Sequence, residues 1–289
     1  STAVGTNALD SNTTGTYNTG IGYYAGEGIT TGSNNVTIGR LAGGGIETAS
    51  GCIAIGYNAI SSNSGNDGSG NENIAIGDSS MLYMEGTRNI AIGSDSLYTA
   101  SSADDNVAVG HQALYFNTTA DVNTAIGAYA LKANTTGGSN VAVGGYSLDA
   151  NTTGSSNTSV GAYSLGANTT ASNNTAVGYT ALQVNTTGAN LTAVGANALV
   201  ANTTGGDNTA VGAYALDANT TGEKNVAVGQ AALTQATTGD RNTAIGNYSM
   251  ADAVVTGNQN TAVGDNSLRE LTSGTLNTAL GCQSLYNNT

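Results

Sequence analysis

Hydrophobic and polar positions recur along the chain with a period of about 17 residues. Each period contains an aliphatic residue followed by glycine, and successive glycines lie 17 residues apart except at three places, where the spacing is 21, 16 or 18. The repeating glycines are Gly5, Gly22, Gly39, Gly56, Gly77, Gly93, Gly110, Gly127, Gly144, Gly161, Gly178, Gly195, Gly212, Gly229, Gly246, Gly264 and Gly281. We therefore expect residues 1–289 to form a single repeat array. Because the chain starts and stops inside a repeat, we expect an excerpt of a longer fibre.

The three residues before each glycine alternate in size. The residue three before the glycine is always Thr, Val or Ile, and the residue directly before it is always aliphatic. Between them stands Ala in 14 repeats, and otherwise Gly20, Thr37 or Ser159. Residues two apart share one face of a strand. The pattern predicts a short strand with its aliphatic face in the core and its small face against a second surface.

A second short strand is predicted after the glycine. The third residue after it is always Ala or Ser, and the fourth is Leu or another large apolar residue except at Gly26 and Gly43. Asn-Thr-Thr follows in eight repeats and predicts a corner, because Asn and Gly favour turns. Repeated glycine and dense β-branching oppose a helix. We predict an all-β fold, a parallel β-roll or β-solenoid of 17 repeats, whose coils lie ~4.8 Å apart.

Equivalent residues of such a fold stack into ladders. Asn stands four residues before the glycine in 14 repeats, and we expect these amides to bond to one another. The small residue inside the strand predicts that three copies pack these faces around a common axis, as a homotrimeric fibre. The predicted trimer interface consists of Ala125, Ala142, Ala176, Ala193, Ala210, Ala227 and Ala244.

Composition narrows the function more than it narrows the fold. The chain has 42 Gly and no Pro, 9% charged residues and a net charge of −13. Six basic residues cannot build a phosphate-neutralising surface, so we expect no nucleic-acid partner. No apolar run approaches the ~20 residues of a membrane-spanning helix, so we expect no membrane insertion.

Groups that carry catalysis or bind metals are sparse. The single histidine, His111, cannot supply a catalytic triad or a multi-histidine metal site. The one acidic doublet, Asp104-Asp105, falls at a corner and is interpreted as a turn, with calcium binding as the lesser alternative. Cys52 and Cys282 lie 13 coils apart, too far for a disulfide. We expect no enzyme, no cofactor and no metal site.

Tyrosine is the residue type that best suggests binding. Tyr129, Tyr146 and Tyr163 hold the same position in consecutive repeats, two residues after the glycine. They predict a surface ladder that either binds a glycan or stacks to stabilise the sheet. The longest repeat carries an insertion within residues 61–73, which we expect to protrude as a loop.

The Asn-Thr-Thr corners allow two further interpretations. They match the acceptor pattern for N-linked glycans. Their threonines also raise the hypothesis of an ice-binding face, although adjacent threonines point to opposite sides of the chain.

The repeat resembles a known class of fibrous proteins. Asn73-Ile-Ala-Ile-Gly77 and Asn89-Ile-Ala-Ile-Gly93 resemble the head repeats of trimeric autotransporter adhesins, which are left-handed parallel β-rolls with a shorter repeat. Residues 174–188 look like repeats of phage and bacterial tail-fibre proteins. The resemblance implies an extracellular fibre shaft on a virion or cell surface. It would act as a rigid spacer for attachment to a host or surface, with cell-surface glycan or receptor as its target.

Two other functions stay open at the level of sequence. One is a monomeric β-solenoid that binds glycan or ice. The other is a self-assembling extracellular filament in which the solenoids stack end to end.

Overall fold

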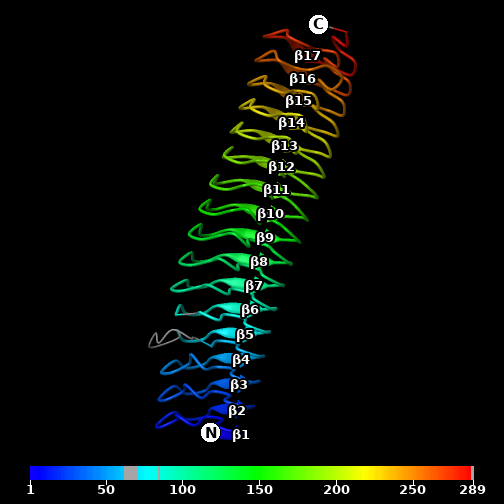
Figure 1. The fold of residues 1–289 in the computed structure, drawn as a ribbon. Helices are drawn as coiled ribbons and strands as arrows, with labels where there is room; N and C mark the ends of the chain where they lie inside the picture. Colours follow the sequence, from blue (N-terminus) through cyan, green and yellow to red (C-terminus); the bar gives the residue numbers. More distant parts are fainter. Residues whose placement is uncertain (62–69, 84, 288–289) are drawn as a thin grey trace. The chain divides into compact units, whose positions relative to one another are not determined.

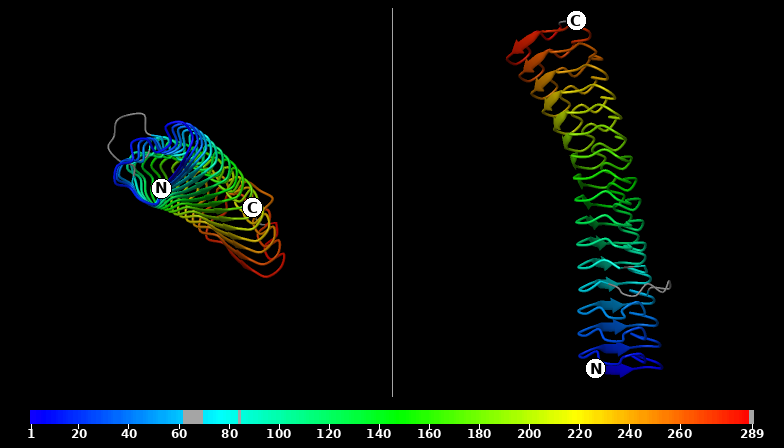
Figure 2. Two further views of the ribbon diagram at one scale, coloured as in Figure 1. Left: turned by 90° about the horizontal axis from the view of Figure 1, so that it is seen from below. Right: turned by 90° about the vertical axis from the view of Figure 1, so that its left-hand side faces the viewer.

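The computed structural model describes residues 1–61, 70–83 and 85–287 as an all-β parallel β-solenoid in which each repeat forms one coil. The chain divides into two compact units, Ser1–Gly145 and Tyr146–Thr289, which we call unit 1 and unit 2. Within each unit the coils are stacked one upon the next (Figure 1). In the end-on view, successive coils of unit 1 overlap (Figure 2). The predicted solenoid is confirmed.

Every coil contributes one strand of three residues. Unit 1 contains β1 (Thr2–Val4), β2 (Thr19–Ile21), β3 (Val36–Ile38), β4 (Ile53–Ile55), β5 (Ile74–Ile76), β6 (Ile90–Ile92), β7 (Val107–Val109), β8 (Thr124–Ile126) and β9 (Val141–Val143). Unit 2 contains β10 (Thr158–Val160), β11 (Thr175–Val177), β12 (Thr192–Val194), β13 (Thr209–Val211), β14 (Val226–Val228), β15 (Thr243–Ile245), β16 (Thr261–Val263) and β17 (Thr278–Leu280).

Within each unit, neighbouring strands pair in parallel and in the register of the repeat. Ala193 of β12, for example, is aligned with Ala210 of β13. The three irregular spacings leave this register intact, since Ile53 pairs with Ile74, Ile74 with Ile90, and Thr243 with Thr261. The extra or missing residues therefore lie outside the strands.

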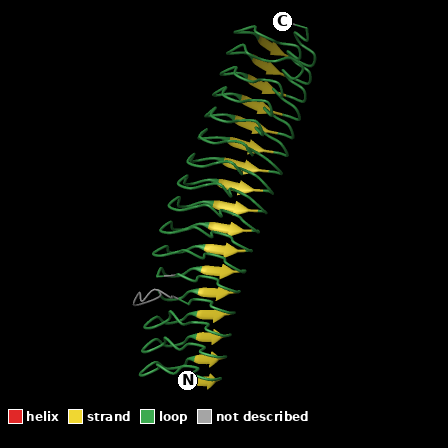
Figure 3. Ribbon diagram, viewed as in Figure 1, coloured by secondary structure: helices red, strands yellow, loops and turns green. Residues whose placement is uncertain are grey.

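The predicted second strand is wrong: the segment after each glycine is a turn. Figure 3 shows how little of each coil is strand. In the coil of Gly212, Tyr214 and Leu216 have φ angles of 59° and 51°. Such left-handed residues cannot continue an extended strand. Backbone bonds still join neighbouring coils here, as from Leu199 N to Ala215 O at 3.0 Å.

The repeating glycine is required for two reasons. Gly195 has a φ of 137°, a conformation that L-residues rarely adopt, and a β-carbon there would lie 2.5 Å from the carbonyl carbon of Gly212. Stacking at this position needs glycine in both coils, because backbone meets backbone.

The interior of each coil is narrow and is filled by the small strand residue and the Leu column. A β-carbon on Gly20, which occupies the small position, would lie 2.9 Å from Leu9 Cγ. The alanines at this position from Ala54 to Ala262 have no exposed surface. The alanine therefore faces inward, and the β-branched residues on either side of it face outward.

Two coils fill this interior differently. Gly26 and Gly43 replace Leu, while Ile29 and Ile46 replace the Asn of the corner and are fully buried. A β-carbon on Gly43 would lie 2.3 Å from Thr37 Cγ2 and 3.3 Å from Ile46 Cδ1. The isoleucines and Thr37 thus occupy the space that Leu fills elsewhere.

Two buried asparagine ladders line the interior. In the ladder four residues before the glycine, Asn208 Oδ1 accepts from Asn225 N at 2.9 Å, and Asn225 Nδ2 donates to Gly239 O at 2.8 Å. The expected amide-to-amide bonds occur at some of these rungs, such as Asn106 Nδ2 to Asn89 Oδ1 at 3.1 Å. Buried amides are thus satisfied largely by the backbone of the next coil.

The corner asparagines form the second ladder, which was not predicted. Asn202 Nδ2 donates to Asn185 Oδ1 at 2.8 Å and to Gly205 O at 3.0 Å. The threonine beside it also stacks, because Thr203 Oγ1 and Thr203 N both donate to Thr220 O at 3.0 Å. Asn-Thr-Thr therefore joins neighbouring coils by hydrogen bonds in addition to forming the bend.

Residues 62–69, which include most of the predicted protruding loop, lie outside the described residues. In the described part of the chain, no helix is long and apolar enough to cross a membrane.

Candidate interaction surfaces

The outer side of the strands forms an uncharged surface, which we call the sheet face. It consists of the residues three before and one before each repeating glycine. The second column reaches 40% exposure at Ile21 and 41% at Ile126 in unit 1, and 39% at Ile245 in unit 2. No charged residue stands at either position in any of the 17 strands. An outward sheet face with only Thr, Val, Ile and Leu is unusual for a surface in contact with water.

The sheet face differs in character between the units. In β3 to β7 both outward positions are Val or Ile, so this part of unit 1 is wholly aliphatic. In unit 2 the first column is Thr in every strand except β14, and the second column is Val, Ile or Leu. Unit 2 thus presents a threonine column beside an aliphatic column.

The alanines predicted to form the trimer interface do not lie on a surface. Ala125, Ala142, Ala176, Ala193, Ala210, Ala227 and Ala244 are all 0% exposed within the single chain. The face assignment is therefore wrong, because these methyl groups already pack inside their own coils. The small residue reflects the thinness of the solenoid interior, and the outward surface belongs to the β-branched columns.

Tyrosines of the predicted ladder stack within unit 2. In unit 2, Tyr146 and Tyr163 stack with ring centroids 5.3 Å apart and planes 5° apart. Tyr179 contacts Tyr163 edge-on at 6.4 Å. Tyr129 belongs to unit 1, where Lys132 Nζ lies 5.1 Å from its ring centroid and His111 packs against it edge-on at 5.2 Å. The stacked residues Tyr146 and Tyr163 nevertheless remain 38% and 42% exposed. Their arrangement is compatible with both interpretations of the ladder.

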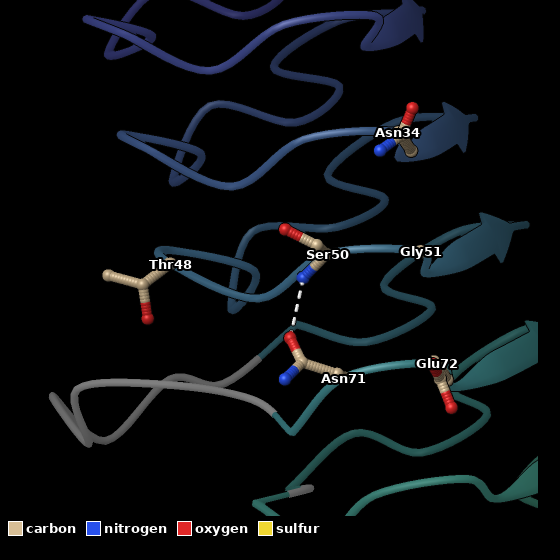
Figure 4. A pocket seen from close by; sticks show the side chains of 6 residues that line it. All are labelled: Asn34, Thr48, Ser50, Gly51, Asn71 and Glu72. Atoms are coloured by element: carbon tan, nitrogen blue, oxygen red, sulfur yellow. Dashed lines mark hydrogen bonds between the residues drawn. The ribbon is translucent and has the colours of Figure 1, made fainter.

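A polar hollow of about 500 Å³ opens on unit 1 beside β3 and β4. It is lined by Asn34, Thr48, Ser50, Gly51, Asn71 and Glu72. Ser50 N donates to Asn71 Oδ1 at 2.8 Å, as Figure 4 shows. The lining residues come from successive coils, in the segment that leads from the corner to the strand. Short polar side chains in this segment accept hydrogen bonds from the preceding coil. Among the described residues that line the hollow, Glu72 is the one ionisable group.

The acidic doublet is occupied by contacts within unit 1. Asp105 makes a two-pronged ion pair with Arg88, with Oδ1 2.6 Å from Nε and Oδ2 2.8 Å from Nη2. The hydrogen bond from Arg88 lowers the pKa of Asp105. Asp104 Oδ1 accepts from Thr87 N at 2.7 Å. Among the described residues, no three His, Cys, Asp or Glu side chains are grouped to hold a metal ion.

The two cysteines are unpaired and differ in exposure. Cys282 is exposed, whereas Cys52 is buried in an asparagine position of the interior. Burial raises the pKa of the Cys52 thiol.

Glycosylation of the stacked corners conflicts with the fold. Asn117, Asn134, Asn151, Asn168 and Asn185 are 0% exposed. Asn185 Nδ2, the atom that a glycan would modify, already donates to Asn168 Oδ1 and Gly188 O. These sites are closed once the coils have formed.

One group of surface residues was missed from the sequence. Tyr83, Tyr98, Tyr115 and Phe116 lie together on unit 1. Tyr98 and Tyr115 stand five residues after the repeating glycine, whereas Tyr83 and Phe116 stand six after it, so a comparison of equivalent positions did not align the four. Comparison of the chain with protein-family models, with curated proteins and with solved structures gave no match.

Proposed function

We propose that the chain is a structural and adhesive fibre element whose copies associate through the sheet face. The observation that supports the proposal is the sheet face itself, which is aliphatic or β-branched in all 17 strands and carries no charge. The carboxylates of this acidic chain all lie elsewhere on the coils. The expected partner is a second and third copy of the chain, and the expected location is extracellular, on a virion or cell surface.

Burial of the sheet face favours such an assembly physically. Complete burial of a Val or Ile side chain contributes about 1.5–3 kcal/mol. The most exposed residues of the second column in the internal strands, such as Ile21 and Ile126, keep about 40% of their surface exposed in the single chain, and the other outward residues there are half-buried. Each therefore has a fraction of that energy left to gain. The contribution repeats in every coil. Threefold symmetry would place the same face of each copy against the other two.

The first test places charge on the sheet face. Val211→Lys with Ile245→Lys should convert a trimer to a monomer without unfolding the coils, because both side chains point outward. Analytical ultracentrifugation measures the mass, and circular dichroism checks the β content. Thr204→Lys with Thr221→Lys is the matched control, since it adds the same charge at exposed positions of the corner. A monomeric wild-type chain, or a trimeric Val211/Ile245 variant, would contradict the proposal.

Ice binding is the second candidate, and the threonine column of unit 2 favours it. The earlier objection concerned the corner threonines. Thr175, Thr192 and Thr209 instead lie on one outward face, regularly spaced beside Val177, Val194 and Val211. An ice-recrystallisation assay on the wild-type chain distinguishes the two functions. A monomer that inhibits ice growth would replace the fibre proposal.

A further inference from the structure

Four aromatic side chains form a cluster on the surface of unit 1. Tyr98 and Tyr115 are stacked, with ring centroids 4.8 Å apart and planes 4° apart. Tyr83 contacts Tyr98 edge-on at 5.5 Å, and Phe116 contacts Tyr115 edge-on at 4.6 Å. We call these four residues the aromatic cluster. Three consecutive coils, those of Gly77, Gly93 and Gly110, contribute to it.

The fold does not require aromatic residues at these positions. In earlier coils of the same unit, the residues equivalent to Tyr98 and Tyr115, five after the repeating glycine, are Asp10, Glu27 and Gly44. The residues equivalent to Tyr83 and Phe116, six after it, are Ser11, Gly28 and Gly45. Those coils still bond to their neighbours, and Tyr24 N to Thr6 O has its counterpart at the cluster in Gln112 N to Ser94 O. A local departure from the repeat that the coils do not need suggests a role in binding.

The cluster is rigid and only partly covered. Backbone bonds fix its coils, from Tyr83 N to Tyr98 O at 3.2 Å and from Phe116 N to Lys132 O at 3.0 Å. The rings at the two ends of the row remain exposed, Tyr83 by 39% and Phe116 by 44%. Two exposed rings held by a stacked pair form a preorganised apolar platform.

A carboxylate contributes negative charge at the stacked pair of this platform. Burial raises the pKa of Tyr98 and of Tyr115, and the negative charge of Asp95 raises both further. The two phenols therefore stay neutral and keep their O–H donors at physiological pH. The site combines exposed aromatic rings with hydroxyl donors and one strong acceptor.

We propose that the aromatic cluster binds a neutral carbohydrate. The apolar C–H face of a sugar ring would lie against Tyr83 or Phe116, and its hydroxyls would donate to Asp95 and accept from the phenols. The ligand is neutral because the chain carries a net charge of −13 and Asp95 lies beside the platform, so an acidic sugar would be repelled. This inference rests on the adhesive part of the proposed function, for which it supplies the target class.

The test uses the full chain on a glycan array that carries neutral hexose, N-acetylhexosamine and sialylated oligosaccharides. Wild-type protein should bind neutral glycans, and the best of them is then titrated by isothermal calorimetry. Tyr83→Ala with Phe116→Ala should weaken binding roughly tenfold or more, which corresponds to about 1.4 kcal/mol. Asp95→Asn should also weaken binding. Tyr17→Ala, which removes a ring that is 79% exposed elsewhere on unit 1, is the control and should bind as wild type.

Two results would overturn this inference: no binding to any neutral glycan, or unchanged affinity in the Tyr83/Phe116 variant. Binding confined to sialylated glycans would also overturn it. Circular dichroism on each variant checks that the coils remain folded. Sedimentation of the same samples keeps the two proposals separate. A trimer that binds no glycan contradicts only the carbohydrate site, whereas a monomer that binds glycan contradicts only the assembly.

Discussion

At the scale of single residues, the buried asparagines matter more than their turn-forming character suggests. Asn202 donates to Asn185 Oδ1 and Gly205 O and accepts from Asn219 Nδ2 at 2.7 Å. All of these atoms are in the interior, where an unsatisfied polar group costs about 1–3 kcal/mol. One side chain therefore holds three coils together.

Replacement of this amide should be costly. Asn202→Ala should lower the free energy of local opening of unit 2 by at least about 2 kcal/mol, because it leaves several buried groups without partners. Hydrogen exchange of the backbone amides from Leu182 to Leu216 measures the effect. Thr204→Ala, an exposed substitution two residues away, should change it by less than about 0.5 kcal/mol. Equal effects of the two changes would refute the role of the ladder.

Left-handed backbone at residues other than glycine is a second feature at this scale. Val122 has a φ of 61° although it is β-branched and 57% exposed. Val122→Gly should stabilise unit 1 by about 1 kcal/mol, since an L-residue pays about 1–2 kcal/mol in this conformation. Val184, also exposed but without a positive φ, is the control: Val184→Gly should destabilise. Thermal unfolding of both variants tests the opposite signs.

At the scale of the coil, the strand and the corner tolerate change differently. In the 16-residue repeat, Gly86 follows Gly77 by nine residues, whereas Gly205 follows Gly195 by ten. The missing residue therefore falls before Gly86, in the corner, and strand pairing on both sides is unaffected. Corner length is adjustable because only the strand has alternating faces.

Two single-residue deletions in one coil test this difference. Deletion of Thr204, in the corner, should leave the β content of unit 2 nearly unchanged. Deletion of Val194, the last residue of β12, should disrupt the neighbouring coils, because a one-residue shift exchanges inward and outward side chains. Limited proteolysis and circular dichroism distinguish the outcomes. Similar losses from both deletions would contradict the assignment.

The same alternation explains what the sequence could predict. The period of 17, the parallel register and the strand position follow from the order of a β-branched, a small and an aliphatic residue before each glycine. Which side faces inward does not follow, because an aliphatic residue suits both a core and a subunit interface. Only the room inside the coil decides, and a β-carbon on Gly20 only 2.9 Å from Leu9 Cγ shows how little room there is.

Two other features of the structure could not be predicted from the sequence, because they depend on the local conformation of the coil. The left-handed residues after the glycine are more often Leu or Tyr than Asn, so their side chains give no sign of the turn. The aromatic cluster combines residues from two different positions of the repeat, five and six after the glycine, which meet only because neighbouring coils pair with this offset, as from Tyr83 N to Tyr98 O.

At the scale of the whole molecule, acidic residues far outnumber basic ones. Several of the few basic side chains lie over tyrosine rings, as Arg40 does over Tyr57 and Arg269 over Tyr248. The net charge of −13 opposes the approach of a second copy. The uncharged sheet face is the surface on which this repulsion is weakest.

Salt should therefore strengthen self-association. Raising NaCl from about 0.01 M to about 1 M shortens the screening length from roughly 30 Å to 3 Å. The apolar contact remains while the repulsion is screened, so sedimentation should show tighter trimers. Dissociation by salt would mean that ion pairs hold the copies together, contrary to an uncharged interface.

The in-register pairing of each strand with its equivalent one repeat later has a consequence for inheritance. In the regular coils, neighbours contact each other through the same positions of the repeat, so gain or loss of one complete regular repeat leaves the pattern of contacts at the surviving junctions unchanged. Recombination between similar repeats in the gene would then change the number of coils by whole repeats. Each product would still fold, so no intermediate in the change of length would be an unfolded protein. Such a protein can evolve its length independently of its surface, and single coils such as those bearing Tyr98 and Tyr115 can diverge while the rest of the array is copied.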